Sequence, residues 1–216
     1  MMPSGLRALR AAGAGACVLA LIAAGPAPGD DATPVLDKLR AAVQSAKSFS
    51  AFFIGPLGNS ISWTVVQPDR IRRVETLMGP QPNDWIVIGH QSYDLDEDGR
   101  WQTKWNSGEA IRYSEILGML IPGTTARALP DREDDGTLMG TVDILVPTRS
   151  YKPPLPPYHQ ICTYDKTTYR LHVCTFEGRW GKFSTTYENW DDPRITVQPP
   201  PGVPAPTAPP SPQPSP

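Results

Sequence analysis

Three histidines and several carboxylate pairs are the side chains that could do acid–base or metal chemistry in this sequence. His90, His159 and His172 are spaced so that no two share one helical face, and we predict no metal site. The carboxylate pairs Asp134-Asp135 and Asp191-Asp192 lie in turn-like contexts. The sequence contains no Gly-x-Ser-x-Gly elbow, Walker loop or dinucleotide fingerprint. We therefore predict a protein that is not an enzyme and uses no cofactor, with a hydrolase that uses turn carboxylates as the alternative.

The acidic run from Asp94 to Gly99 matches the first half of a calcium-binding EF-hand loop. The twelfth position of that loop, which should be a bidentate Glu, is Trp105. The flanking residues alternate like strands instead of forming the helices that an EF-hand requires. We favour an acidic hairpin turn over a calcium site.

Of the three cysteines, Cys17 lies in an amino-terminal segment that we expect to be removed on export, which leaves Cys162 and Cys174, twelve positions apart. An even number of cysteines in an oxidising compartment favours a disulfide, and the residues between them indicate two strands around a turn. Such a bond would stabilise the fold by roughly 3 kcal/mol. The alternative is two free, buried thiols.

Aromatic side chains on alternating positions are the other candidates for a site. Most of them would form the core, and those near one rim of a groove could contact an apolar ligand. The set consists of Phe53, Trp63, Trp85, Tyr93, Trp101, Phe183 and Tyr187.

The rings must be positioned by a β-sheet, and the segment Ser60–Val66 is the strand around which the rest of that sheet is arranged. Ile61, Trp63 and Val65 alternate with small polar residues, which is the period of a strand with one buried face. Turn residues separate it from other segments of the same period. The remaining strands are expected at 49–54, 70–77, 85–88, 91–95, 100–104, 138–146, 158–165, 168–176, 181–187 and 194–197.

Two segments have the period of a helix. The first is Pro34–Lys47, with Thr33 as the expected N-cap and Pro34 at the first helical position. The second is Glu109–Leu120, which ends before Pro122-Gly123. A sheet with an aromatic face needs a cover, and these helices could provide it.

The two ends of the chain do not look globular. Residues 1–24 resemble a secretory signal with cleavage between 24 and 29, and residues 200–216 form a Pro-rich tail that we expect to be disordered. The tail could be a simple solvated end, a tether or a docking peptide. A net charge of −2 provides no basic surface for nucleic acid. We predict one domain over 33–199, exported to the periplasm or the extracellular space.

The order of these features resembles the LolA-like family of envelope lipoprotein and lipid carriers. The similarity covers roughly residues 33–199 and is carried by Trp63, the step Pro68-Asp-Arg-Ile-Arg72, the pair Ile86–Gly89 and Tyr93, and the closing segment 186–199. It implies an α+β fold: a curved antiparallel β-sheet, or half-barrel, with two or more helices on its concave side. The Pro-rich tail departs from the family pattern, and the amino-terminal lipidated cysteine of LppX-like lipoproteins is missing.

The resemblance also implies an apolar cavity for the acyl chains of a lipid or a lipidated protein. In the carriers, an arginine of the Pro-x-Arg-aliphatic-Arg step holds lid helices closed, a role that would fall to Arg72 or Arg70. A membrane protein could donate or accept the cargo, and the carrier itself should be a monomer. An envelope interaction or sensing module, like RseB-type regulators, is the alternative. We predict ligand contacts from Trp63, Val65, Arg70, Arg72, Trp85, Tyr93, Trp101, Ile116 and Leu120.

Overall fold

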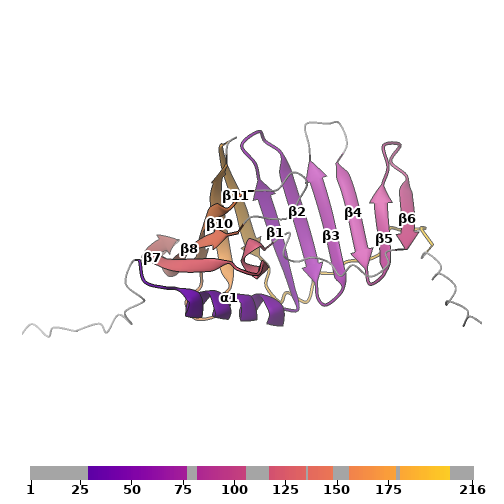
Figure 1. Ribbon diagram of the computed structural model, residues 1–216. Helices are drawn as coiled ribbons and strands as arrows, with labels where there is room; N and C mark the ends of the chain where they lie inside the picture. The colour runs from indigo at the N-terminus through magenta and orange to yellow at the C-terminus, as the bar shows by residue number, and fades with distance from the viewer. Residues whose placement is uncertain are drawn as a thin grey trace, which may run out of the picture.

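An antiparallel sheet of 11 strands dominates the computed structural model (Figure 1). The structure describes residues 29–76, 82–105, 117–134, 136–147, 156–178 and 181–204. The sheet is curved and does not close, and its two edges are β6 and β7. Its order is β6-β5-β4-β3-β2-β1-β11-β10-β9-β8-β7, so two meanders are joined where the first strand pairs with the last.

The strands of the first meander lie close to where the alternation predicts them. They are β1 (Ser48–Ile54), β2 (Ser60–Val66), β3 (Arg70–Thr76), β4 (Asn83–Ile88), β5 (Gln91–Leu95) and β6 (Trp101–Trp105). The second meander comprises β7 (Thr125–Asp134), β8 (Thr137–Val146), β9 (Tyr158–Tyr164), β10 (Leu171–Gly178) and β11 (Gly181–Glu188).

Strand β7 is absent from the sequence prediction because its residues do not alternate between large apolar and polar types. Its buried positions are the small Ala126 and Ala128, and its second half is charged. Pro130 falls where the register with β8 shifts, which a proline tolerates on an edge strand. The short strand expected at 194–197 is wrong, since that segment is irregular in the structure.

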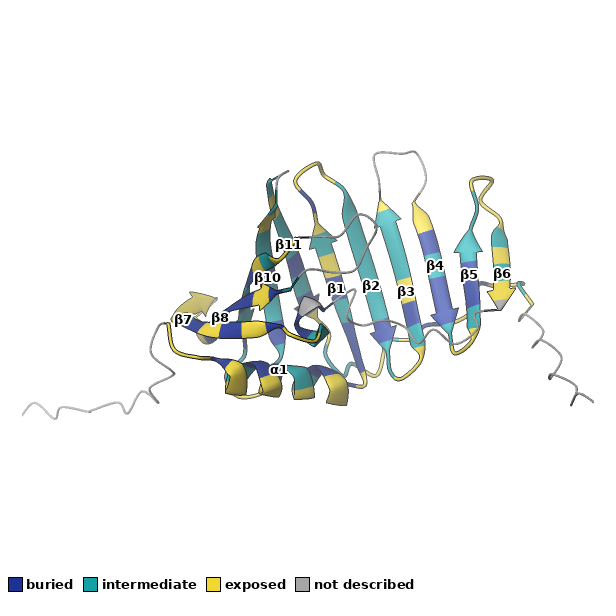
Figure 2. Cartoon of the chain, viewed as in Figure 1, coloured by how far each residue is buried: buried dark blue, intermediate teal, exposed yellow. Residues whose placement is uncertain are grey.

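The helix α1 (Thr33–Ser45) confirms the first helical prediction. Its buried residues Leu36, Leu39 and Val43 face the sheet, while the opposite side is exposed (Figure 2). Thr33 is not the N-cap, because the helix begins at Thr33 itself. Instead the Asp31 carboxylate accepts hydrogen bonds from the Thr33 amide (2.9 Å) and hydroxyl (2.6 Å).

The second predicted helix, Glu109–Leu120, lies largely outside the described residues, so the expectation of two or more helices is reduced to one described α-helix. Its last residues form the short 3-10 helix η1 (Gly118–Leu120). Leu117 and Met119 are buried in the core, and Arg40 of α1 donates a hydrogen bond to the Met119 carbonyl (2.9 Å). No helix of the described chain is both long and apolar enough to cross a membrane.

The disulfide prediction is confirmed, and the bond joins β9 to β10. Cys162 and Cys174 occupy directly opposed positions of the two strands and are almost completely buried. The hairpin prediction for the acidic run is also confirmed. Asp96 begins the β5–β6 turn and accepts hydrogen bonds from the Arg100 amide and the Gln102 side chain, which hold its pKa below the usual range.

The two faces of the sheet carry separate apolar clusters. The main cluster lies on the face covered by α1, which we call the inner face; it includes Phe49, Val65 and Val142. The second cluster lies on the outer face of β2–β6 and contains Ile86 and Tyr93. A C-terminal strap, residues 189–204, crosses this face and adds Val197 and Val203 to the second cluster (Figure 1). The predicted tail continues beyond Pro204 outside the described residues.

Candidate ligand-binding surface

A row of aromatic rings crosses five neighbouring strands on the inner face. Register places these rings on one side of the sheet: Phe53 opposes Ile61 and Thr185, and Phe176 opposes Phe183. We call the set the aromatic row; it consists of Trp63 on β2, Phe53 on β1, Phe183 on β11, Phe176 on β10 and Tyr158 on β9.

The rings of the aromatic row contact one another in sequence. The Trp63 and Phe53 centroids are 6.4 Å apart, and the next distance, from Phe53 to Phe183, is 5.7 Å. Phe183 and Phe176 stack at 4.6 Å, and Phe176 lies 5.1 Å from Tyr158. These separations are typical of favourable aromatic pairs, so the row forms a continuous apolar surface.

All five rings are half-buried, in contrast to the residues beneath α1. Phe49 and Val65, which lie nearer to the helix on the same strands, are 0% exposed. Fully burying a large apolar side chain stabilises by about 1.5–3 kcal/mol relative to full exposure. A ligand that completed the burial of this row would therefore recover part of that free energy on five side chains.

The structure places four of the nine predicted contact residues on the inner face. Trp63, Trp85 and Leu120 are partly buried and pack against the main cluster. Val65 belongs to the cluster itself and is fully buried under the helix. Ile116 lies outside the described residues.

The other four predicted residues lie on the outer face. For Arg70 and Arg72 the reason is that the turn at 67–69 pairs Val66 with Arg70 and that side chains of β3 alternate between the faces. Arg72 forms an ion pair with Asp84, with Nε to Oδ1 at 3.1 Å, and this hydrogen bond raises the pKa of Arg72. Arg70 donates to the Val197 carbonyl (3.2 Å). Tyr93, which is fully buried, and Trp101 pack beneath the strap, so these four do not join the aromatic row.

Phe176 and Tyr158 are not among the predicted contacts, although the expected disulfide could have identified them. Cys162 and Cys174 must point to the same face in order to bond. Because side chains on one face of a strand recur every second residue, Phe176 and Tyr158 then share that face. Phe53 and Phe183 were recognised as aromatic positions without being selected.

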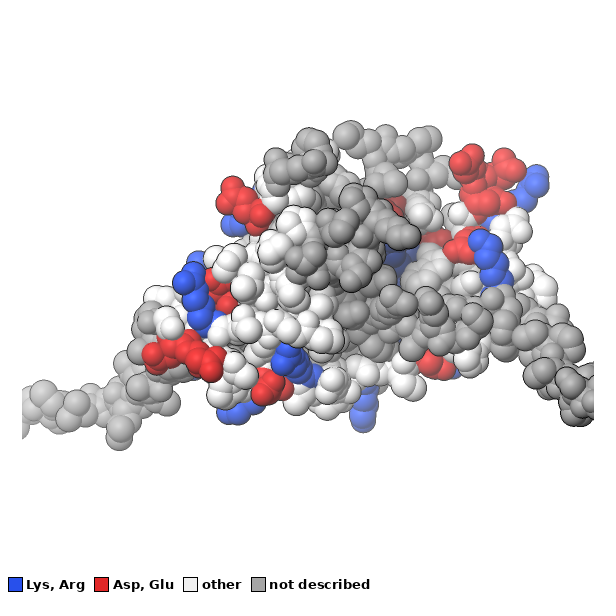
Figure 3. Space-filling model, in the orientation of Figure 1, with Lys and Arg blue, Asp and Glu red and all other residues white. Residues whose placement is uncertain are grey.

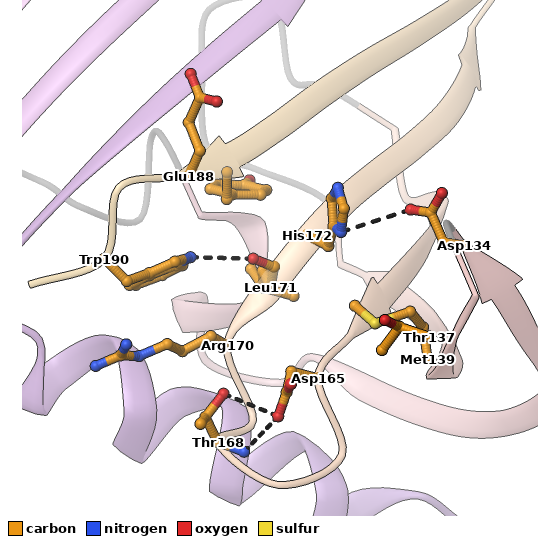
Figure 4. Close-up of a pocket in the computed structure, with 11 residues that line it drawn as sticks. Asp134, Thr137, Met139, Asp165, Thr168, Arg170, Leu171, His172, Glu188 and Trp190 are labelled. Atoms are coloured by element: carbon orange, nitrogen blue, oxygen red, sulfur yellow. Dashed lines mark hydrogen bonds and ion pairs between the residues drawn. The ribbon is translucent and has the colours of Figure 1, made fainter.

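A cleft of about 510 Å³ opens at the opposite end of β10 and β11 from the aromatic row. Figure 4 shows His172 beside Asp134, and Thr168 beside Asp165 in the β9–β10 turn. His172 Nδ1 lies 3.6 Å from an Asp134 carboxylate oxygen, and Thr168 donates its hydroxyl to Asp165 (3.0 Å). The lining comprises Asp134, Thr137, Met139, Asp165, Thr168, Arg170, Leu171, His172, Tyr187, Glu188 and Trp190.

This cleft contains none of the nine predicted contact residues. Asp165 also accepts the amides of Thr167 and Thr168, and these hydrogen bonds lower its pKa. Arg170 pairs with Asp191 at the start of the strap. The carboxylates and cations thus hold the hairpin and strap in place, and the cleft is a weaker candidate for an apolar ligand than the aromatic row.

Among the described residues, the charges outside this cleft provide neither a metal site nor, on the face seen in Figure 3, a surface of one sign. Within the described ranges, no group of three His, Cys, Asp or Glu residues could hold a metal ion. Figure 3 shows charges of both signs around the rim of the described surface in this view, with acidic side chains gathered at the β5–β6 hairpin.

Comparison with known proteins supports this architecture. No family model matches the sequence, and no curated protein matches it. The structure superposes on the crystal structure of the Mycobacterium tuberculosis lipoprotein LppX with a TM-score of 0.53 and 17% identity, covering 76% of this chain and 98% of LppX. This chain has a LolA/LppX-like fold.

A second mycobacterial structure agrees with the first. LprF from Mycobacterium bovis gives a TM-score of 0.52 and 14% identity over 78% of this chain and 99% of LprF. A LolA superfamily protein from Nitrosomonas europaea is matched at 9% identity, over 79% of this chain and 96% of its own, with a TM-score of 0.35 that is too low to carry an argument. At these identities the LolA/LppX-like likeness concerns the fold alone.

Proposed function

We propose that this protein is an exported, non-enzymatic carrier that holds the acyl chains of a lipid or a lipidated protein against its inner face. The observation that carries the proposal is the aromatic row, a continuous set of half-buried rings on the helix-covered side of an unclosed sheet. The LolA/LppX-like fold supports it, because the sequence resembles carriers of that fold.

The energetics of an acyl chain suit this surface. Each methylene group removed from water contributes about 0.8 kcal/mol, so ten methylene groups lying on the row would contribute about 8 kcal/mol. Lost translational freedom and chain ordering offset a substantial part of that gain. The remainder is compatible with a carrier that takes up a chain and later releases it.

A pair of adjacent phenylalanines provides a matched test. Phe53 belongs to the aromatic row, whereas its neighbour Phe52 points to the outer face and is 41% exposed. In a displacement assay with the neutral fluorescent probe N-phenyl-1-naphthylamine, Phe53→Gln should weaken uptake of acyl chains and Phe52→Gln should leave it unchanged. Equal affinities for both variants and the wild type would refute the proposed surface, provided that thermal unfolding shows both variants folded.

An envelope interaction module is the second candidate, and exposed apolar residues favour it. Phe52 and Ile54 lie two residues apart on the outer face of β1, and Leu57 in the β1–β2 turn is 62% exposed. Exposed apolar groups of this kind mark protein or membrane contacts. In a carrier, this hairpin could contact a membrane-protein donor or acceptor.

The triple substitution of Phe52, Ile54 and Leu57 by Ser separates the two functions. For a carrier that docks through this hairpin, transfer between membranes should fall while binding of free acyl chains is retained. If chain binding is absent in the wild type and a partner is lost in the variant, the interaction module is the better account.

A further inference from the structure

A charged side chain interrupts the apolar inner face beside the aromatic row. Arg73 on β3 lies directly between two tryptophans, since register pairs it with Trp63 on β2 and with Trp85 on β4. Both tryptophans are partly buried and pack against the main cluster. The guanidinium is therefore carried on the helix-covered side of the sheet, next to the first ring of the row.

Arg73 forms an ion pair with Glu75, two residues along the same strand. The Nη2 to Oε2 distance is 2.6 Å, and the side chains are 35% and 16% exposed respectively. A guanidinium has five N–H donors in a planar fork that suits carboxylates and phosphates. Among the described residues, the hydrogen-bond partner of Arg73 is Glu75, which engages one edge of the guanidinium. The other N–H donors of Arg73 are left for a second anion.

The inner face is divided into an apolar half and a polar half. The aromatic row covers β9, β10, β11, β1 and β2, whereas the inner positions of β3 to β6 beyond Trp85 include charged and amide groups. Asp94 and Lys104 form an ion pair there at 3.1 Å, and Gln102 lies opposite Asp94. Arg73 lies at the boundary of the two halves, which is the arrangement that an amphipathic ligand requires.

We propose that the cargo is an anionic amphiphile whose carboxylate or phosphate is bound by Arg73 between Trp63 and Trp85, while its chain lies along the aromatic row. Glu75 holds the guanidinium in place when the site is empty and competes with the incoming anion. This inference rests on the proposed carrier function, and it adds the chemical class of the head group.

Binding of three amphiphiles that each contain twelve carbon atoms tests the assignment. Dodecanoate, dodecyl phosphate and uncharged dodecanol are each titrated against bound N-phenyl-1-naphthylamine at neutral pH. The wild type should bind the two anions more tightly than dodecanol. Arg73→Gln should weaken one or both anions by about ten-fold or more, because a charged hydrogen bond is lost, and should leave dodecanol unchanged. The relative loss for the two anions identifies a carboxylate or a phosphate as the preferred group.

The adjacent Arg72 provides the control. It lies on the outer face in an ion pair with Asp84, so Arg72→Gln removes the same charge from the same strand without touching the site. Its affinities for all three amphiphiles should match the wild type. Equal losses from Arg72→Gln and Arg73→Gln would indicate a general effect of net charge and would overturn the assignment.

Substitution of Glu75 gives a prediction of opposite sign, which holds even if Arg73→Gln does not fold. Glu75→Gln frees the guanidinium and should tighten the anions relative to dodecanol. If the wild type binds dodecanol as tightly as dodecanoate, or if neither substitution changes selectivity, the head-group inference fails and the carrier proposal stands. If none of the three chains binds the wild type, both fail.

Discussion

The C-terminal strap should contribute measurably to stability through Val197. This side chain is 2% exposed and packs against Ile86 and Tyr93 on the outer face, although no strand pairing holds the strap there. Val197→Ala removes two carbon atoms from a buried position. At about 0.8 kcal/mol for each, and with the cavity that remains, the expected loss is about 2 kcal/mol.

The measurement is urea unfolding followed by far-UV circular dichroism, with thermal unfolding in parallel. A loss of about 2 kcal/mol should lower Tm by about 4–8 °C in a domain of this size. The hydrogen bond from the Arg70 guanidinium to the Val197 carbonyl is retained in the variant, so the change isolates the Val197 side chain.

The neighbouring exposed Thr196 supplies the control, since Thr196→Ala removes atoms of similar volume from a solvent-facing position. Its unfolding free energy should lie within about 0.5 kcal/mol of the wild type. If Val197→Ala is no more destabilising than Thr196→Ala, the strap does not pack on the outer face as described, and the reasoning about the second cluster is refuted.

Replacing Cys162 and Cys174 together by Ser should cost about 3 kcal/mol in urea unfolding, and a change below about 1 kcal/mol would contradict a stabilising crosslink. Burial raises the pKa of Tyr164 to about 12, so its contribution to stability is complete below pH 10 and is lost as the pH rises towards 12. Tyr164→Phe should therefore reduce the loss of unfolding free energy at alkaline pH. If the dependence of stability on pH is unchanged in this variant, the buried Tyr164 is not its cause. Arg127→Ala should lower the free energy of chemical unfolding by about 1–3 kcal/mol, because buried Asp143 loses its partner at 2.8 Å. A loss no larger than that of an exposed surface substitution would show that His159 alone is a sufficient partner for Asp143.

Much of the sheet could be predicted from the sequence because its strands alternate strongly and end at turn residues. Ser60–Val66 and Gln91–Leu95 have the predicted bounds, and Pro34 marks the first turn of α1. Strand β7 could not be found in this way, because Ala126 and Ala128 bury little area and resemble loop residues. A strand with small inner residues is recognised only through its partner, here β8.

The candidate site was less predictable. The two-residue alternation of side chains shows which residues of one strand share a face, but it does not show which face of one strand continues into which face of the next. The alternation of a strand places Arg72 and Arg73 on opposite faces of β3, but only the pairing of Val66 with Arg70 shows which face lies under α1. The predicted contacts consequently combined Trp63 from the inner face with Arg70 and Arg72 from the outer face. The aromatic row likewise depends on the pairing of β1 with β11, strands that are far apart in the sequence.

The most direct test of the account is to locate a bound acyl chain. A fatty acid with a photoreactive diazirine near the end of its chain is bound, irradiated and mapped onto the protein by peptide mass spectrometry. The account predicts crosslinks to the inner-face residues Phe53, Phe176 and Phe183 of the aromatic row. Crosslinks concentrated on the outer face, at Phe52 or Thr175, would contradict it.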